Sequence, residues 1–139
     1  MRLEKEFEVD RSRESVVEIV ASEDTLAGFF PESETEIVSR EGNRTTTRTH
    51  YVAMGQPGTA TFHFTYLSDG DIEFEKVCDG NVWRELHGTL SFGESGSRTQ
   101  IRIAMEGRTQ ALIPEFTIKG AMRDQISQIA RALDERLRT

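Results

Sequence analysis

Two histidines, His50 and His63, have a spacing that could support metal chemistry. They flank the turn signal "GQPG", and if Gly55 faces Gly58 across an antiparallel hairpin, the two imidazoles stand directly opposite each other. Two facing imidazoles supply half of a typical zinc site. Both point away from the aromatic side of the hairpin, however, and no acidic or thiol ligand is evident beside them. We therefore interpret them as an exposed cross-strand pair and predict no metal site.

Two cations, Lys76 and Arg84, alternate with apolar residues. Arg84 is in phase with Leu86, and Lys76 is in phase with Phe74. A charge on an apolar face must reach solvent or find a partner. Each side chain could extend outward from a strand end, or could stand at the mouth of a cavity and receive a carboxylate or an enolate oxygen. Arg84 is therefore a candidate ligand-binding residue.

Aromatic residues occupy every second position of the stretch "ATFHFTY". In an extended strand Phe62, Phe64 and Tyr66 share one face. The hairpin register proposed for the histidines places Tyr51 opposite Phe62, on the same face. Both tyrosine hydroxyls could donate to a ligand carbonyl, and a hydroxyl that reaches a carbonyl of the core explains them equally well.

The familiar combinations of nucleophile and base do not occur in this sequence. Cys78, the single cysteine, has no histidine in phase with it, so we interpret it as a packing residue. There is no glycine-rich phosphate loop, serine elbow or HExxH motif. The predicted registers place no His, Asp or Glu on the inner face. Catalytic residues therefore stay unassigned, no cofactor is implied, and binding without a reaction is favoured over catalysis.

The composition limits the class of protein. The 139 residues are the length of one ordinary domain, 1–139, with 36% hydrophobic and 29% charged residues. A net charge of −7 argues against nucleic acid as a partner. No apolar run approaches the ~20 residues that span a bilayer, and the N-terminal stretch lacks the apolar segment of a signal peptide. We therefore expect a cytoplasmic protein without a transmembrane segment.

Hydrophobic periodicity divides the chain into strands and helices. "LEKEFEV" alternates as a strand with one wet side, and "RESVVEIVASEDTLAGFFPE" predicts two short helices that end by Pro31. Turn signals then separate six strands in meander order, at 35–41, 44–54, 59–67, 72–78, 82–92 and 98–110. From 113 to 139 apolar residues recur at spacings of three and four, which predicts a long helix with Pro114 in its first turn.

Loop lengths predict the register of neighbouring strands. A four-residue "ESGS" loop pairs Leu90 with Ile101, and a three-residue "DGN" loop pairs Phe74 with Leu86. In both hairpins an apolar residue then faces an apolar residue. Register and hydrophobic pattern therefore agree.

Two residues of the strand at 82–92 break its pattern. Gly88 weakens the middle of the strand, which indicates sharp curvature or room for the helix or a ligand. Trp83 falls on the wet side of the alternation. Either a bulge reverses the strand there, or Trp83 is an exposed aromatic that could form an interface.

The order of elements places an apolar sheet face against an apolar helix stripe. It resembles the START-like helix-grip (SRPBCC) superfamily, whose bacterial members include polyketide cyclase/dehydrase-like proteins and proteins like the G-type subunit of carbon monoxide dehydrogenase. The resemblance rests on "DRSRESVVEIVASEDTLAGFFP" for the short helices, "WRELHGTLSF" for the central strand and "PEFTIKGAMRDQISQIARALDERL" for the last helix. It implies an α+β helix-grip fold, in which a curved antiparallel sheet of about seven strands wraps around the long C-terminal helix.

Known members of this superfamily mostly bind hydrophobic molecules between the sheet and the helix, and a minority catalyse reactions. The resemblance therefore implies binding, transport or sequestration of a small hydrophobic ligand such as a lipid, a polyketide or a quinone, by a monomer or a homodimer. The alternatives are a polyketide cyclase/dehydratase-type enzyme and a protein-interaction module with a filled core. The predicted ligand-binding residues are Phe29, Phe30, Tyr51, Phe62, Phe64, Tyr66, Phe74, Arg84, Leu86, Gly88, Leu90, Ile103, Met105, Phe116, Met122 and Ile126.

Overall fold

A computed structural model describes residues 1–31, 33–53, 55–78 and 82–138 of the chain. Its elements, in chain order, are β1 (Arg2–Val9), α1 (Arg13–Val20), α2 (Glu23–Ala27), β2 (Glu34–Glu41), β3 (Arg44–Ala53), β4 (Gln56–Tyr66), β5 (Ile72–Lys76), β6 (Trp83–Ser95), β7 (Arg98–Thr109), the 3-10 turn η1 (Glu115–Thr117) and α3 (Lys119–Arg138). This order confirms the predicted α+β arrangement. The predicted strand ends agree to within a few residues, and positions 54, 79–81 ("DGN") and 139 of the predicted elements lie outside the described residues.

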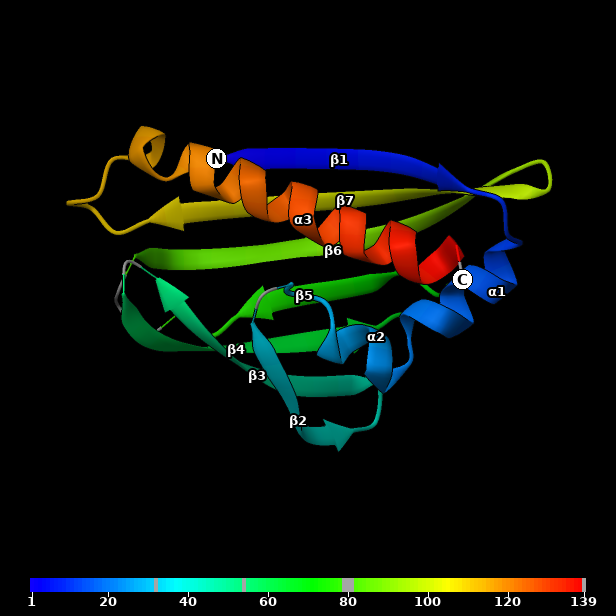
Figure 1. The fold of residues 1–139 in the computed structure, drawn as a ribbon, viewed down its shortest axis with the longest axis horizontal. Coiled ribbons are helices and arrows are strands. Elements are labelled where there is room, and N and C mark those ends of the chain that lie inside the picture. The colour runs from blue at the N-terminus through cyan, green and yellow to red at the C-terminus, as the bar shows by residue number, and fades with distance from the viewer. Residues whose placement is uncertain (32, 54, 79–81, 139) are drawn as a thin grey trace.

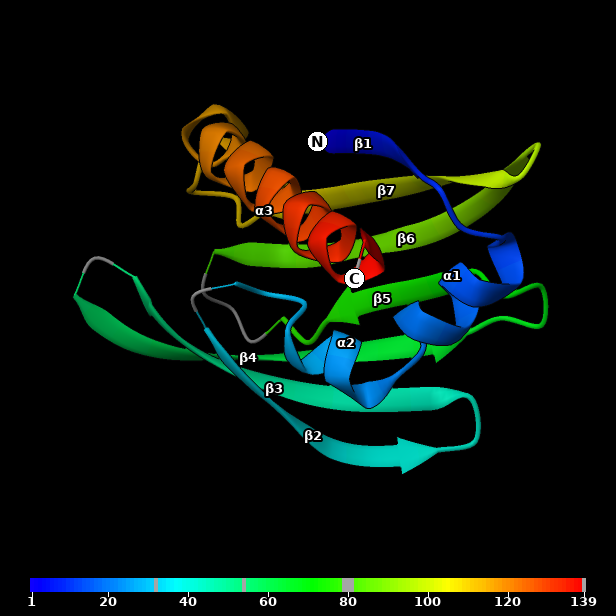
Figure 2. The ribbon, with the colours of Figure 1, turned by 45° about the vertical axis from the view of Figure 1, so that its right-hand side comes forward.

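The strands form one antiparallel sheet in the order β1-β7-β6-β5-β4-β3-β2. The first strand therefore pairs with the last, and β2 lies at the opposite edge. Local sequence explains the helices between β1 and β2: Ser12 caps α1 by accepting from the Ser15 N–H, and Ser22 caps α2 by accepting from the Thr25 N–H. Figures 1 and 2 show the strands bending around the helical side of the sheet.

All three α-helices lie on one face of the sheet, which we call the inner face; the opposite face is the outer face. Figure 2 shows α3 crossing β7 and β6, with its C-terminal end close to α1. The apolar stripe of α3 is buried against the sheet, as its spacing predicts. Its buried residues are Met122, Ile126, Ile129, Ala130, Leu133 and Leu137.

The register of the β3–β4 hairpin differs from the prediction. Tyr51 pairs with Gly58 instead of Phe62, because the two strands continue to the Ala53–Gln56 pair and the turn is tighter than expected. The two histidines therefore do not face each other: His50 pairs with Thr59, and His63 pairs with Thr46. The shift involves an even number of residues, so every side chain keeps its predicted face.

The registers around β6 also move by an even number of residues. Ser95 pairs with Arg98 across a two-residue turn in which Gly96 has φ of 66°, so Leu90 pairs with Ile103 and not with Ile101. Phe74 pairs with Gly88 and not with Leu86. Both predicted pairings were wrong, but the division into inner and outer residues is unchanged.

The long helix begins later than predicted. Pro114 is extended, with ψ of 134°, and precedes η1, so the α-helix starts only at Lys119. The Thr109 hydroxyl donates to the Ile113 carbonyl at 2.6 Å, which ties this connection to the end of β7. None of the described helices is long and apolar enough to cross a membrane.

Candidate functional site

A cavity of about 260 Å³ opens on the inner face, between the sheet and the N-terminal half of α3. Its walls come from the segment after α2, from β3, β4 and the end of β5, from the start of β6 and from α3. The residues that line it are Phe30, Ser33, Thr49, Tyr51, Thr59, Ala60, Phe62, Lys76, Val82, Trp83, Leu86 and Gln125. The lining is mainly apolar with a few polar groups, which is typical of small-molecule sites.

A bulge at the start of β6 brings Trp83 into this cavity. Trp83 pairs with Thr109 and Glu85 with Arg108, so one extra residue is inserted in β6 between these two pairs. Trp83 and Leu86 consequently both reach the inner side. This settles the alternatives left open by the sequence, because Trp83 is half-buried and packs against the core.

The same bulge turns Arg84 outward. The prediction that Arg84 alternates inward with Leu86 assumed a regular strand, and the structure places its side chain in solvent. Phe116 is also exposed, at 80%, because it lies on η1 and not on the buried stripe of α3. The structure therefore separates both residues from the cavity.

The other predicted residues divide into two groups. Phe30, Tyr51, Phe62 and Leu86 line the cavity. The remaining apolar residues are buried in the core and fill it: Phe29, Phe64, Phe74, Leu90, Ile103, Met105, Met122 and Ile126.

The filled part of the core is built around Phe29. Its ring makes edge contacts with Phe64 at 5.3 Å and with Phe74 at 5.8 Å between ring centroids. Beside this cluster, the ring of Phe30 lies 4.8 Å from that of Phe62. The Tyr66 hydroxyl donates to the Ala21 carbonyl at 3.4 Å, so the core-carbonyl interpretation describes it. The aromatic row of β4 thus meets the "FF" segment after α2, and only its Phe62 end reaches the cavity.

Three aromatic rings lie over glycines of the neighbouring strand. A Cβ added to Gly58 would lie 2.5 Å from the Tyr51 ring, and one added to Gly107 would lie 2.6 Å from the Trp83 ring. The space at Gly88 is taken in the same way, because its added Cβ would overlap the ring of Phe74. The room that Gly88 was expected to leave for the helix or a ligand is therefore occupied by Phe74.

Several lining residues were not among the sequence predictions, Gln125 being the clearest case. It follows Met122 by three residues and precedes Ile129 by four, so a polar residue interrupts the apolar stripe of α3 at the cavity. That interruption was a readable signal. Lys76 was recognised as an inward-phased cation, and its pairing with Phe62 places it beside the aromatic wall.

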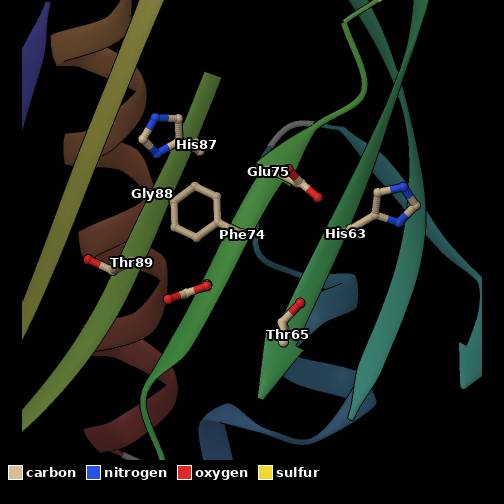
Figure 3. A pocket seen from close by; sticks show the side chains of 8 residues that line it. His63, Thr65, Phe74, Glu75, His87, Gly88 and Thr89 are labelled. Atoms are coloured by element: carbon tan, nitrogen blue, oxygen red, sulfur yellow. The ribbon is translucent and has the colours of Figure 1, made fainter. Parts of the chain in front are cut away.

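A second concave region, of about 340 Å³, lies on the outer face over β4, β5 and β6. Figure 3 shows its lining: His63, Thr65, Glu73, Phe74, Glu75, His87, Gly88 and Thr89. The Nδ1 atom of His63 lies 2.8 Å from the Thr46 hydroxyl. Within the described ranges, no three His, Cys, Asp or Glu side chains are grouped to hold a metal ion. Covering Glu73 and Glu75 with an apolar ligand would remove their hydration, so the inner cavity is the better hydrophobic site.

The resolved electrostatic perturbation also lies on the outer face. Hydrogen bonds from Arg102, at 2.6 Å, and from Arg2, at 2.9 Å, lower the pKa of the Glu4 carboxyl, and the same pairing with Glu4 raises the pKa of Arg102. These groups join β1 to β7 in full contact with solvent. They belong to the surface of the sheet and not to the cavity.

No protein-family model matches this chain, and no curated protein matches it. Solved structures do match it over almost its whole length. The Zhui aromatase/cyclase from Streptomyces sp. R1128 superimposes with a TM-score of 0.79 at 15% identity, covering 99% of this chain and 90% of that one. A START superfamily protein from Mycobacterium smegmatis gives 0.79 at 20% identity, covering 99% and 97%.

A STAR-related lipid transfer protein from Xanthomonas axonopodis gives a TM-score of 0.72 at 14% identity, covering 99% of this chain and 86% of that one. Likeness at such low identity is a likeness of fold. The order of elements, the curved antiparallel sheet and the long C-terminal helix agree with it. This chain has the START-like helix-grip fold.

Proposed function

We propose that this protein binds a small, mainly apolar molecule in the inner cavity. The observation that carries the proposal is the lining itself: Phe30, Phe62, Trp83 and Leu86 surround a hollow of about 260 Å³ beside α3. Removing apolar ligand surface from water contributes roughly 25 cal/mol per Å², and the aromatic wall offers that surface without rearrangement.

The comparisons support this proposal by analogy of fold. One protein of the same fold is described as a lipid transfer protein and another as an aromatase/cyclase. A cyclase or dehydratase reaction would need an acid or a base at the ligand. Among the described lining residues there is no His, Asp or Glu, so binding is the better-supported function.

Ala60→Leu tests the proposal, because Ala60 lines the cavity and a larger side chain would fill it. We expect the neutral dye N-phenyl-1-naphthylamine to bind the wild type saturably, and Ala60→Leu to weaken binding by about tenfold or more. The measurement is a fluorescence titration, accompanied by a thermal melt.

Ala121→Leu is the matched control, because it makes the same change at an exposed position of α3. It should leave the affinity for the dye unchanged. Equal dye affinity in the wild type and in a folded Ala60→Leu variant, or no saturable binding by the wild type, would contradict the proposal.

A further inference from the structure

Lys76 is the single charged side chain among the described residues that line the cavity. It ends β5, pairs with Phe62 across the sheet and is half-buried. Its aliphatic stem therefore lies along the aromatic wall while its ammonium group stands at the opening. A cation in this position is partly removed from water, and it is stabilised only if a negative group approaches it.

No described carboxylate forms an ion pair with Lys76, although ion pairs are frequent elsewhere on the sheet. Its sequence neighbour Glu75 faces outward and binds Arg44 at 3.4 Å, and Glu85 binds Arg108 at 3.4 Å. Alternation along the strands sends both carboxylates to the outer face. The cavity thus holds one cation, and the acids nearest to it in the sheet are engaged on the other side.

The neutral polar groups of the cavity complete an arrangement that suits an anion. Within the described chain, the side chains of Ser33, Tyr51 and Gln125 make no hydrogen bond, whereas the Thr49 hydroxyl is paired with Thr35 at 2.8 Å. Tyr51, Ser33 and Gln125 can each donate a hydrogen bond, and the Lys76 ammonium can donate three. Donors outnumber strong acceptors, so a ligand with an anionic oxygen is best matched.

We propose that the ligand is a small organic anion, with a flat apolar body between Phe30, Phe62 and Trp83 and a carboxylate or equivalent oxyanion on Lys76. This inference rests on the proposed function and names the class of molecule bound. Aromatic side chains on several sides favour a flat body, and a charge-assisted hydrogen bond in a half-buried site is stronger than a neutral one. The anionic oxygen therefore decides which apolar molecules are retained.

The test compares 2-naphthoate with 2-naphthamide, which share size and shape and differ in charge. Calorimetric titrations at neutral pH use the wild type, Lys76→Met and Arg84→Met, the last being a control because Arg84 is a nearby cation on the outer side. We expect the wild type to bind naphthoate at least about tenfold more tightly than naphthamide. Lys76→Met should remove that preference and keep the affinity for naphthamide, whereas Arg84→Met should behave as the wild type.

The outcomes separate the two proposals. If the wild type binds the acid and the amide equally, or if the preference survives in Lys76→Met, the inference about the anion is overturned and cavity binding stands. If neither naphthyl compound nor the neutral dye binds, the proposed function fails and the inference fails with it. Retained naphthamide binding by Lys76→Met also demonstrates that this variant is folded.

Discussion

At the residue scale, the inner face of β3 carries a row of threonines where apolar residues would be expected. Thr45 and Thr47 are fully buried, and their hydroxyls have no hydrogen-bond partner among the described residues. Thr49, next in the row, differs because its hydroxyl pairs with that of Thr35 at 2.8 Å. A buried hydroxyl without a partner costs about 1–3 kcal/mol relative to a satisfied one. The row therefore weakens the core on the way to the cavity.

Thr47→Val should raise the free energy of unfolding by about 1 kcal/mol, because valine has the same shape and lacks the unsatisfied hydroxyl. Urea denaturation followed by circular dichroism measures the change. Thr49→Val is the matched control and should lower stability by about 1 kcal/mol, because it breaks the bond to Thr35. A Thr47→Val variant as destabilised as Thr49→Val would show that the Thr47 hydroxyl has a partner in solution.

The inward or outward orientation of most residues could be read from the sequence, because the alternation of side chains along a strand is local. Phe62 and Leu86 were correctly placed on the inner face. Arg84 was not, because one inserted residue reverses a strand and leaves no reliable mark in the pattern. Gln125 reaches the cavity from α3, and a contact between a helix and a distant strand depends on the packing of the whole domain.

At the element scale, the bulge of β6 and the glycine of β7 act together. The bulge turns Trp83 inward, and Gly107 leaves the space over which its ring lies. Leu86 packs at the same point, 3.0 Å from the position of an added Cβ. Two strands therefore cooperate to place one wall of the cavity.

Gly107→Ala should displace the Trp83 ring, because the new methyl group would overlap it. We expect a loss of about 1–3 kcal/mol of stability, a shifted tryptophan emission and weaker binding of the neutral dye. Trp83 is the only tryptophan of the chain, so its emission reports on this wall alone.

Gly93→Ala provides the comparison, because a Cβ there would meet nothing within 4 Å. It should leave both the emission and the dye affinity unchanged. Identical spectra for Gly107→Ala and Gly93→Ala would refute this description of the Trp83 wall.

The order and type of the elements were predictable, whereas the pairing of the strands was only partly so. Turn residues and alternation identify six consecutive strands, but they do not determine how many residues each turn contains. The hairpin ending in the Ser95–Arg98 pair is tighter than expected, and every partner along β6 and β7 moves with it. Such shifts preserve faces when they are even, which explains why the fold was predicted correctly despite wrong pairs.

At the scale of the whole molecule, one end of the inner face is filled and the other is hollow. At the filled end, the C-terminal part of α3 lies beside α1, and the Arg11 side chain donates to the Leu137 carbonyl. At the other end, the chain reaches α3 through η1, and the cavity opens between Gln125 and the start of β6. A curved sheet in contact with a straight helix leaves such a wedge unless large side chains fill it.

The charge of the molecule is divided in the same way. The chain has a net charge of −7, and many of its carboxylates lie on the outer face in pairs such as Glu4–Arg102 and Glu75–Arg44. The cavity lining, by contrast, includes one cation and no carboxylate among its described residues. A negative exterior slows the approach of anions at low salt, so raising the ionic strength should speed entry while leaving the short-range contact with Lys76 in place.

The most direct measurement of the central claim is a heteronuclear NMR titration of the protein with 2-naphthoate. We expect saturable shifts for the backbone amides around the inner cavity, including those of Phe62, Lys76 and Trp83, and none for His63 and His87 in the outer groove. Shifts confined to the outer groove, or no saturable shift at all, would contradict binding in the inner cavity.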